Sequence, residues 1–273
     1  MNDYNISQKE FELITGYIYR EIGISLPITK KTLVKSRLTK RLVKLNLKNF
    51  MEYYHYLENE KTGEELLILT NEITTNVTSF FREASQWEYL ETVIEKKIKN
   101  KDKKLRIWSS ASSSGQEPYT IIMFLMNNIK DIKNWDIKIL ATDISEEILT
   151  KAIEGEYDLK DIQGIPKKMI LEYFNENKIT NKYIIKEKLK KYITFRKFNL
   201  VSGDYNILKD NTFDWIFCRN VMIYFDKTSK EKVVLNLIDK IKKDGLFFLG
   251  HSENLVSIPG VRLKVEKPSI FRK

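Results

Sequence analysis

From Leu105 onward, short apolar runs alternate with segments of helical periodicity, and this alternation constrains the fold more than any other feature of the chain. Strand-like runs lie at 106–109, 137–143, 215–218 and 245–250, and helical segments lie between them at 119–127, 145–152 and 229–242. Strands separated by helices in this way indicate a parallel sheet with helices on both faces. We therefore predict a Rossmann-like α/β fold with a mostly parallel sheet.

Residues 154–198 do not follow this alternation. They contain a polar run at 175–182 and two β-like pieces at 183–185 and 192–195. We predict a small antiparallel β-subdomain, inserted at about 154–198 between two of the alternating units.

The first 75 residues carry only helical patterns. Ser7 and Glu10 have capping-box spacing, and Gly23 and Pro27 interrupt the chain. Further helices are expected at 28–45, 50–58 and 64–73. The predicted organisation is a small all-helical domain at 1–75 and a second domain at 76–273.

Composition excludes several classes of protein. The chain is 42% hydrophobic, and no apolar run is long enough for a transmembrane helix. The polar start and the single cysteine, Cys218, favour a cytoplasmic protein without membrane insertion. His55 and His251 lack partners at metal-ligand spacing, so we predict no metal site. Nothing in the sequence demands more than a monomer.

Polar residues follow the predicted strands, at the edge where open α/β sheets hold ligands. The loop 110–118 has one glycine, Gly115, which argues against a dinucleotide pyrophosphate and favours a ligand without phosphates. Asp143 ends the second strand and could accept both ribose hydroxyls of a nucleoside. Asp143 or Ser145 could also cap the next helix, and the two roles need not exclude each other. Asn199 could bind an adenine ring or serve only as a turn residue.

The segment 218–225 is the strongest candidate for an active-site rim. Arg219 and Asn220 follow a buried strand and precede Tyr224. Cys218 is predicted to be a packed thiol.

Two further segments carry candidate residues. In the linker between the domains, Thr78 and Arg82 lie near a pair of phenylalanines. In the second helix, Arg37, Arg41 and Lys44 form a basic ridge, with Lys40, Lys31 and Lys35 beside it. Such a ridge is either a solvated face or a docking surface for an acidic helix or a nucleic acid. The formal net charge of +10 is also compatible with an acidic partner, although much of it is lysine on exposed helix faces.

Five segments occur in an order and spacing that resemble the motifs of chemotaxis receptor methyltransferases of the CheR type. They are TTNVTSFFRE, IWSSASSSGQEPY, LATDIS, FDWIFCRNVMIYFDK and GLFFLGHSEN. The resemblance implies an S-adenosylmethionine-dependent protein-glutamate O-methyltransferase. It would esterify glutamates in the cytoplasmic helical region of methyl-accepting chemoreceptors.

The resemblance also implies roles for individual residues. Cofactor binding falls on the positions that match the family motifs, which are Asn76, Thr78, Arg82, Glu117, Asp143, Asn199, Leu200, Arg219 and Asn220. Arg82 and Tyr224 are implied to orient the substrate carboxylate. Arg37, Lys40 and Arg41 match the receptor-docking helix, and the domain at 1–75 would be the docking domain.

The chain departs from the family pattern at several positions. Ser110 and Ser112 stand where alanine is common, and Gln116 replaces a frequent acid. The inserted subdomain lacks the glycine-rich turn of members that dock on a receptor's C-terminal pentapeptide. Two alternatives remain open: a nucleic-acid methyltransferase and a non-catalytic cofactor-binding module. We expect no nucleic acid partner, because no base-flipping signature is present.

Overall fold

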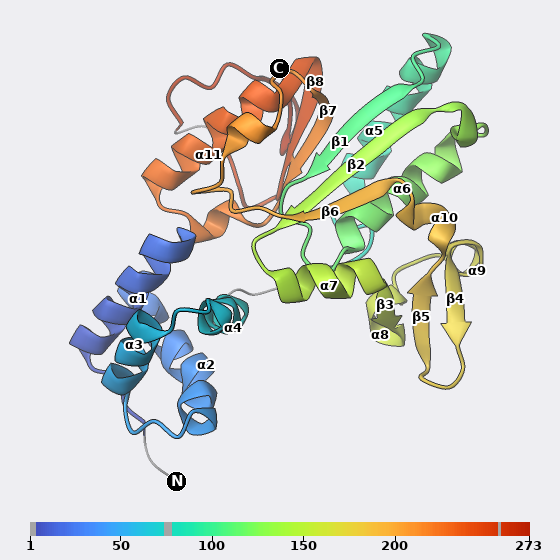
Figure 1. Cartoon of the computed structure of the whole chain (residues 1–273). Coiled ribbons are helices and arrows are strands. Elements are labelled where there is room, and N and C mark those ends of the chain that lie inside the picture. Colours follow the sequence, from blue (N-terminus) through green and yellow to red (C-terminus); the bar gives the residue numbers. More distant parts are fainter. Residues whose placement is uncertain (1–3, 74–77, 256–257) are drawn as a thin grey trace. The chain divides into compact units, whose positions relative to one another are not determined.

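The computed structural model describes residues 4–73, 78–255 and 258–273, and Figure 1 shows its elements. Contacts within the chain divide it into two compact units. The smaller unit comprises residues 4–73 together with Tyr224–Ser229, and the larger comprises residues 78–223 and Lys230–Lys273.

The smaller unit is helical, as predicted. Its elements are α1 (Gln8–Ile22), η1 (Ile28–Lys30), α2 (Lys31–Lys44), α3 (Phe50–Asn59) and α4 (Glu64–Ile73). The predicted capping box is present: Glu10 N–H donates to Ser7 Oγ, and Ser7 N–H donates to the Glu10 carboxylate. The helices bury one apolar face each, with side chains that include Phe11, Ile14, Ile18, Val34, Leu38, Leu42, Phe50 and Leu57.

The larger unit contains a seven-stranded sheet with the order β6-β2-β1-β7-β8-β10-β9. Its strands are β1 (Lys104–Ser109), β2 (Asp136–Asp143), β6 (Ile193–Lys197), β7 (Phe213–Cys218), β8 (Ile241–Leu249), β9 (Lys264–Lys267) and β10 (Ile270–Arg272). Strands β6, β2, β1, β7 and β8 run parallel to one another. Strands β10 and β9 extend the sheet beyond β8, and both pair in antiparallel fashion. This arrangement confirms the predicted mostly parallel sheet.

Helices cover the sheet on both faces (Figure 1). Trp87 and Leu90 of α5 (Ala84–Lys99) pack with α6 (Gln116–Asn128) and with Ile107 of β1 in the main buried cluster. The neighbouring Trp108 points to the opposite face, where its ring contacts Phe198, Tyr205 and Phe213. This alternation follows from the period of two along a strand. The remaining elements are η2 (Ile132–Asn134), α7 (Glu146–Glu154), η3 (Tyr205–Ile207), η4 (Met222–Tyr224) and α11 (Lys227–Lys240).

A small antiparallel sheet with the order β3-β5-β4 lies beside the main sheet (Figure 1). It consists of β3 (Glu156–Asp158), β4 (Phe174–Asn177) and β5 (Lys182–Ile185), accompanied by α8 (Leu159–Ile162), α9 (Lys167–Tyr173) and α10 (Glu187–Lys190). An inserted β-subdomain was predicted here, but the prediction extended it too far. Residues 193–195 belong to β6, which pairs in parallel with β2. The prediction was wrong because an alternating apolar pattern reports a half-buried strand without identifying its neighbour.

The second difference is at the start of β8. The sequence predicts a helix to 242 and a strand from 245, whereas α11 ends at Lys240 and β8 already begins at Ile241. Asp244 has φ 64, and the register between β7 and β8 shifts in this region. The polar residues 242–244 therefore form an irregular strand start where a helix end was expected.

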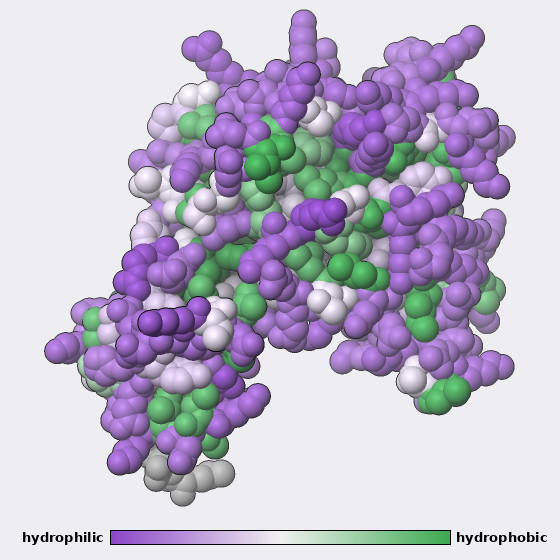
Figure 2. All heavy atoms as spheres, in the orientation of Figure 1, coloured by the Kyte–Doolittle hydropathy of each residue, from purple (hydrophilic) through white to green (hydrophobic). Residues whose placement is uncertain are grey.

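Hydrophilic residues cover most of the surface visible in Figure 2. Within the described ranges, none of the helices combines the length and the apolar character needed to cross a bilayer.

Candidate functional site

The carboxyl ends of β1, β2 and β7 lie side by side in the larger unit. Ser109 at the end of β1 is in register with Ala141 of β2 and with Phe217 of β7. The loops that follow these three strands therefore leave the sheet at one edge, where open α/β sheets hold ligands.

The serine-rich loop after β1 is held to both neighbouring strands. Ser110 donates from its N–H and from its hydroxyl to the Phe217 carbonyl, each at 2.9 Å, and Ser112 N–H donates to the Thr142 carbonyl at 2.8 Å. Gly115 ends the loop at φ 94, where an added Cβ would lie 3.0 Å from the Tyr157 hydroxyl. Small residues thus let the loop fold tightly against the strand ends.

Asp143 connects this loop to the start of α7. Its Oδ2 accepts from Ser113 N–H at 2.8 Å, and its Oδ1 accepts from Ser145 N–H at 3.1 Å. The helix cap is Ser145, whose hydroxyl accepts from Ile148 N–H at 3.1 Å, so the alternative of an Asp143 cap is removed. Burial raises the pKa of Asp143, and the backbone hydrogen bonds act against this rise.

Arg219 is the centre of a buried charge cluster. Its side chain is 3% exposed, and Nε donates to Glu83 Oε2 at 3.0 Å. Nη2 donates to the Arg82 carbonyl at 2.7 Å, and Nη1 lies 3.3 Å from Glu117 Oε2. The other oxygen of Glu117 accepts from the Ser109 hydroxyl at 2.6 Å. One guanidinium therefore joins the loops before α5 and after β7 to the first turn of α6.

Glu117 is the residue of this cluster that could pair with a cationic ligand group, although the charge of Arg82 also acts on it. Burial raises the pKa of Glu117, while Arg219 and the Ser109 hydrogen bond act in the opposite direction. Arg219 forms ion pairs with both Glu117 and Glu83, and Glu83 accepts the hydrogen bond that Arg219 Nε–H donates. A ligand ammonium beside Glu117 would offset the desolvation of its carboxylate.

Asn220, directly after Arg219, adopts φ 57, and its N–H donates to Glu253 Oε2 at 2.8 Å. Asn199 follows β6, and its Oδ1 accepts from Val201 N–H at 2.8 Å and from Ser202 N–H at 3.2 Å. The turn role that the sequence left open for Asn199 is therefore present, with its amide oxygen engaged. Leu200 is 5% exposed, and its carbonyl accepts from the Tyr205 hydroxyl at 2.8 Å.

The candidate residues of the linker, together with Tyr224, differ in whether the structure describes them and in the unit to which they belong. Asn76 lies outside the described residues, and Thr78 is partly exposed just before Phe80. Arg82 belongs to the larger unit, where its carbonyl also accepts from Trp87 Nε1 at 3.0 Å. Tyr224 belongs to the smaller unit, where its carbonyl accepts from Ser25 N–H at 2.9 Å.

The three predicted docking residues of α2 differ sharply in their surroundings. Lys40 is exposed. Arg41 forms a bidentate pair with Glu65, whose carboxylate also accepts from the Tyr53 hydroxyl at 2.8 Å. Arg37 Nη1 donates to the carbonyls of Glu72 and Ile73 at 2.7 and 3.1 Å.

Sequence reasoning missed two acids, Glu83 and Glu253, although both lie inside the segments quoted for the resemblance. Glu83 has φ 63 and accepts from Arg219 and from His251 N–H at 3.0 Å. Glu253 is 8% exposed. Each lies in a loop, so no periodic pattern marked it as buried. Cys218, predicted to be packed, is fully buried, and burial raises its pKa.

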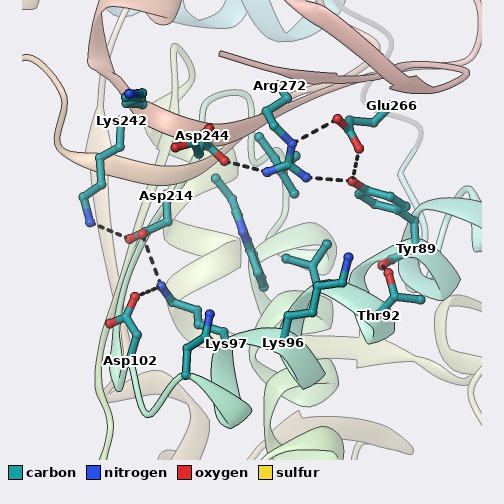
Figure 3. Close-up of a pocket in the computed structure, with 16 residues that line it drawn as sticks. Tyr89, Thr92, Lys96, Lys97, Asp102, Asp214, Lys242, Asp244, Glu266 and Arg272 are labelled. Carbon is teal, nitrogen blue, oxygen red and sulfur yellow. Dashed lines mark hydrogen bonds and ion pairs between the residues drawn. The ribbon is translucent and has the colours of Figure 1, made fainter.

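A pocket of about 510 Å³ lies near the amino ends of β7 and β8, away from the carboxyl-end loops. Figure 3 shows residues that line it. Its charged side chains largely neutralise one another: Lys242 pairs with Asp214 at 2.9 Å, and Arg272 pairs with Glu266 at 3.0 Å. The candidate site is therefore the loop cluster at the carboxyl ends of the strands. Among the described residues, no group of three or more His, Cys, Asp or Glu side chains could hold a metal ion.

Comparison with known proteins agrees with this geometry. Residues 76–271 match the family described as "CheR methyltransferase, SAM binding domain", and residues 9–74 match "CheR methyltransferase, all-alpha domain". The chain is 38% identical to "Chemotaxis protein methyltransferase" of Borreliella burgdorferi, with 92% of this chain and 90% of the relative covered. It is 36% identical to "Chemotaxis protein methyltransferase 2" of Pseudomonas aeruginosa (93% and 89% covered) and 34% identical to the Escherichia coli "Chemotaxis protein methyltransferase" (91% and 85%). The chain has an N-terminal helical unit and a mostly parallel sheet with a charged loop cluster, and it is similar to these proteins over nearly its whole length. The chain therefore belongs to the CheR family of S-adenosylmethionine-dependent chemotaxis methyltransferases.

Proposed function

We propose that the protein transfers a methyl group from S-adenosylmethionine to glutamate side-chain carboxylates of chemoreceptors and so forms glutamate methyl esters. The observation that carries the proposal is the buried cluster of Glu117, Arg219 and Glu83, which lies with Asp143 among the loops at the carboxyl ends of the parallel strands. Membership of the CheR family supplies the reaction class, and the cluster supplies a place for a cationic cofactor.

The residues present fit S-adenosylmethionine. Asp143 would hold the ribose hydroxyls, and Glu117 would face the amino group of the methionine part. Asn199, whose amide oxygen accepts within its turn, could donate from its NH2 group to the acceptor nitrogens of adenine. The hydroxyls of Ser112 and Ser113 are buried without a hydrogen-bond partner within the described part of the chain, as expected beside a polar ligand. Asn76, Thr78, Leu200 and Asn220 complete the proposed site, and no metal is needed for it.

The chemistry requires orientation more than proton transfer. When bound, the cofactor supplies an electrophilic methyl group on a sulfonium. A glutamate carboxylate has an ordinary pKa of about 4.3 and is already ionised at neutral pH, so no general base is needed. Arg82 and Tyr224 are proposed to hold this carboxylate by charge-assisted hydrogen bonds without protonating it. Removal of water from the carboxylate would raise its reactivity further.

The helical domain at 1–75 is proposed to dock on the cytoplasmic helical region of the receptor, with the protein acting as a monomer. An acidic helix is the proposed partner of the basic helix α2. Lys40 is the exposed member of the predicted set. Arg41 is held by Glu65 inside the unit, so any contribution of Arg41 to docking would be indirect.

The proposal is tested by transfer of labelled methyl from S-adenosylmethionine to chemoreceptor-containing membranes, followed by mild alkali. We expect the label to be released as volatile methanol, since a carboxyl methyl ester is hydrolysed under these conditions. Alkali-stable label would contradict the proposal and point to nitrogen or nucleic-acid methylation. Cofactor binding without transfer to any receptor tested would favour a non-catalytic module.

A further inference from the structure

Glu253 ties together the loops that follow two neighbouring strands. Its Oε2 accepts from Gly250 N–H, after β8, and from Asn220 N–H, after β7, each at 2.8 Å. Its Oε1 accepts from Met222 N–H at 2.8 Å. Three backbone donors thus converge on one carboxylate, and Glu253 as a whole residue is 8% exposed. Such a carboxylate acts only as an acceptor, and its hydrogen bonds are charge-assisted.

The loop that Glu253 holds has an unusual shape. Asn220 adopts φ 57, a left-handed conformation that asparagine tolerates better than most residues. Its side chain crosses the backbone of Gly250 so closely that an added Cβ there would lie 2.5 Å from Asn220 Nδ2 and 2.8 Å from Glu253 Oε2. Gly250 and Glu253 therefore determine together where the Asn220 amide lies.

Arg219, the preceding residue, is held by different partners. Its guanidinium is fixed by Glu83, Glu117 and the Arg82 carbonyl. The loop that carries Glu253 also contacts this cluster, because His251 N–H donates to Glu83 Oε1 at 3.0 Å. A change at Glu253 should therefore act directly on Asn220 and Met222, and on Arg219 only indirectly, through His251 and Glu83.

We propose that Glu253 is a positioning residue that orients Asn220 for cofactor binding. The inference rests on the proposed function, in which Asn220 contacts S-adenosylmethionine. Glu253 itself acts through the backbone N–H groups of Asn220 and Met222. It therefore contributes to cofactor affinity and not to the methyl transfer step.

The test is Glu253→Gln. Glutamine keeps the shape of the side chain but offers one oxygen, so at least one of the three N–H groups would face an NH2 group. A buried donor without an acceptor is unfavourable, and the loop is expected to shift. We expect about tenfold weaker binding of S-adenosylhomocysteine, equivalent to about 1.4 kcal/mol. The KM for S-adenosylmethionine should rise by a similar factor, while kcat at saturating cofactor should change by less than about twofold.

The matched control is Glu266→Gln. Glu266 accepts from the Tyr89 hydroxyl at 2.8 Å and from Arg272 Nε at 3.0 Å, and it lines the pocket that lies away from the carboxyl-end loops (Figure 3). It undergoes the same exchange of carboxylate for amide and should lose thermal stability without losing cofactor affinity. Gly250→Ala is the second variant, because its methyl group would displace both the Asn220 amide and the Glu253 carboxylate without changing either residue.

The outcomes distinguish the inference from the function on which it rests. If the wild-type protein fails to bind S-adenosylhomocysteine in a calorimetric titration, the proposed function fails and the inference fails with it. If the wild type binds and Glu253→Gln binds equally well, the inference alone is overturned. Should Glu253→Gln not fold, unchanged affinity in Gly250→Ala would overturn it, and a matching rise in KM would support it.

Discussion

At the residue scale, the protonation state of Glu117 makes the stability of the protein depend on pH. Burial raises its pKa above the ordinary value of 4.5, against the opposing effects of Arg219 and Ser109. At a pH between the ordinary pKa of 4.5 and the raised pKa of the folded protein, Glu117 is protonated in the folded protein and ionised in the unfolded chain. This carboxyl group therefore contributes less to stability as the pH rises through that window.

Replacement of Glu117 by Gln should remove this dependence. We expect the melting temperature of the wild type, relative to Glu117→Gln, to fall as the pH rises from 4.5 through the raised pKa. Cofactor affinity of the wild type should show the opposite trend, because the ionised carboxylate would bind the ammonium. Parallel melting profiles of the two proteins across this range would show that burial does not perturb Glu117.

Asp143 allows a similar comparison along a single strand. Asp143→Asn keeps the size of the side chain but removes the charge that would strengthen hydrogen bonds to ribose, each worth about 1.5–3 kcal/mol. We expect cofactor binding to weaken by about tenfold or more. Asp136→Asn, at the first residue of the same strand, removes the pair with Arg106 and should leave the affinity unchanged. Equal affinity of Asp143→Asn and wild type would disprove the ribose assignment.

At the scale of elements, α2 combines a structural cation with an exposed one. The Arg41 side chain is 10% exposed and pairs with Glu65, which is 2% exposed. Arg41→Met should destabilise the helical unit by about 3–5 kcal/mol, because a buried carboxylate would lose its partner. A denaturant titration that shows a change below about 1 kcal/mol would contradict this role.

Lys40→Glu should instead leave stability near that of the wild type and reduce receptor methylation. Reversal of an exposed charge weakens docking on an acidic surface mainly through the association rate. Lys9→Glu, an exposed lysine of α1, is the matched control and should have a smaller effect. Equal methylation rates for the two variants would remove α2 from the docking surface.

At the scale of the whole molecule, the two units share the chain in an interleaved way. Tyr224–Ser229 belongs to the helical unit although residues before and after it belong to the larger unit. This segment is fixed by the hydrogen bond from the Tyr19 hydroxyl to Asp226 at 2.7 Å and by that from Ser25 to the Tyr224 carbonyl. If the larger unit unfolds, the residues on both sides of Tyr224–Ser229 lose their structure, and we expect this to destabilise the contacts of that segment in the smaller unit.

We expect one cooperative thermal transition, which S-adenosylhomocysteine raises and Arg41→Met lowers. At a ligand concentration of about 100 Kd, the stabilisation is about 2.7 kcal/mol. Scanning calorimetry of the full chain with and without the ligand measures this. Two separate transitions, of which the ligand moves only one, would show that the units unfold independently.

Much of the fold and part of the site could be predicted from local patterns. Apolar periodicity identified the helices and most strands, and the Ser7–Glu10 spacing identified a cap, because these features depend on neighbours a few residues away. Asp143 ends β2 and Arg219 directly follows β7, so their positions relative to the strands marked both as candidates.

Only the tertiary structure decided which distant residues meet. Glu83 reaches Arg219 across 136 residues, Glu253 reaches Asn220 across 33, and Arg41 reaches Glu65 across 24. The same limit explains β6, whose sequence marks a strand but whose partner, β2, is set by strand order. Periodicity records which side of an element is buried, whereas the partner of a buried charge or of a strand depends on long-range packing.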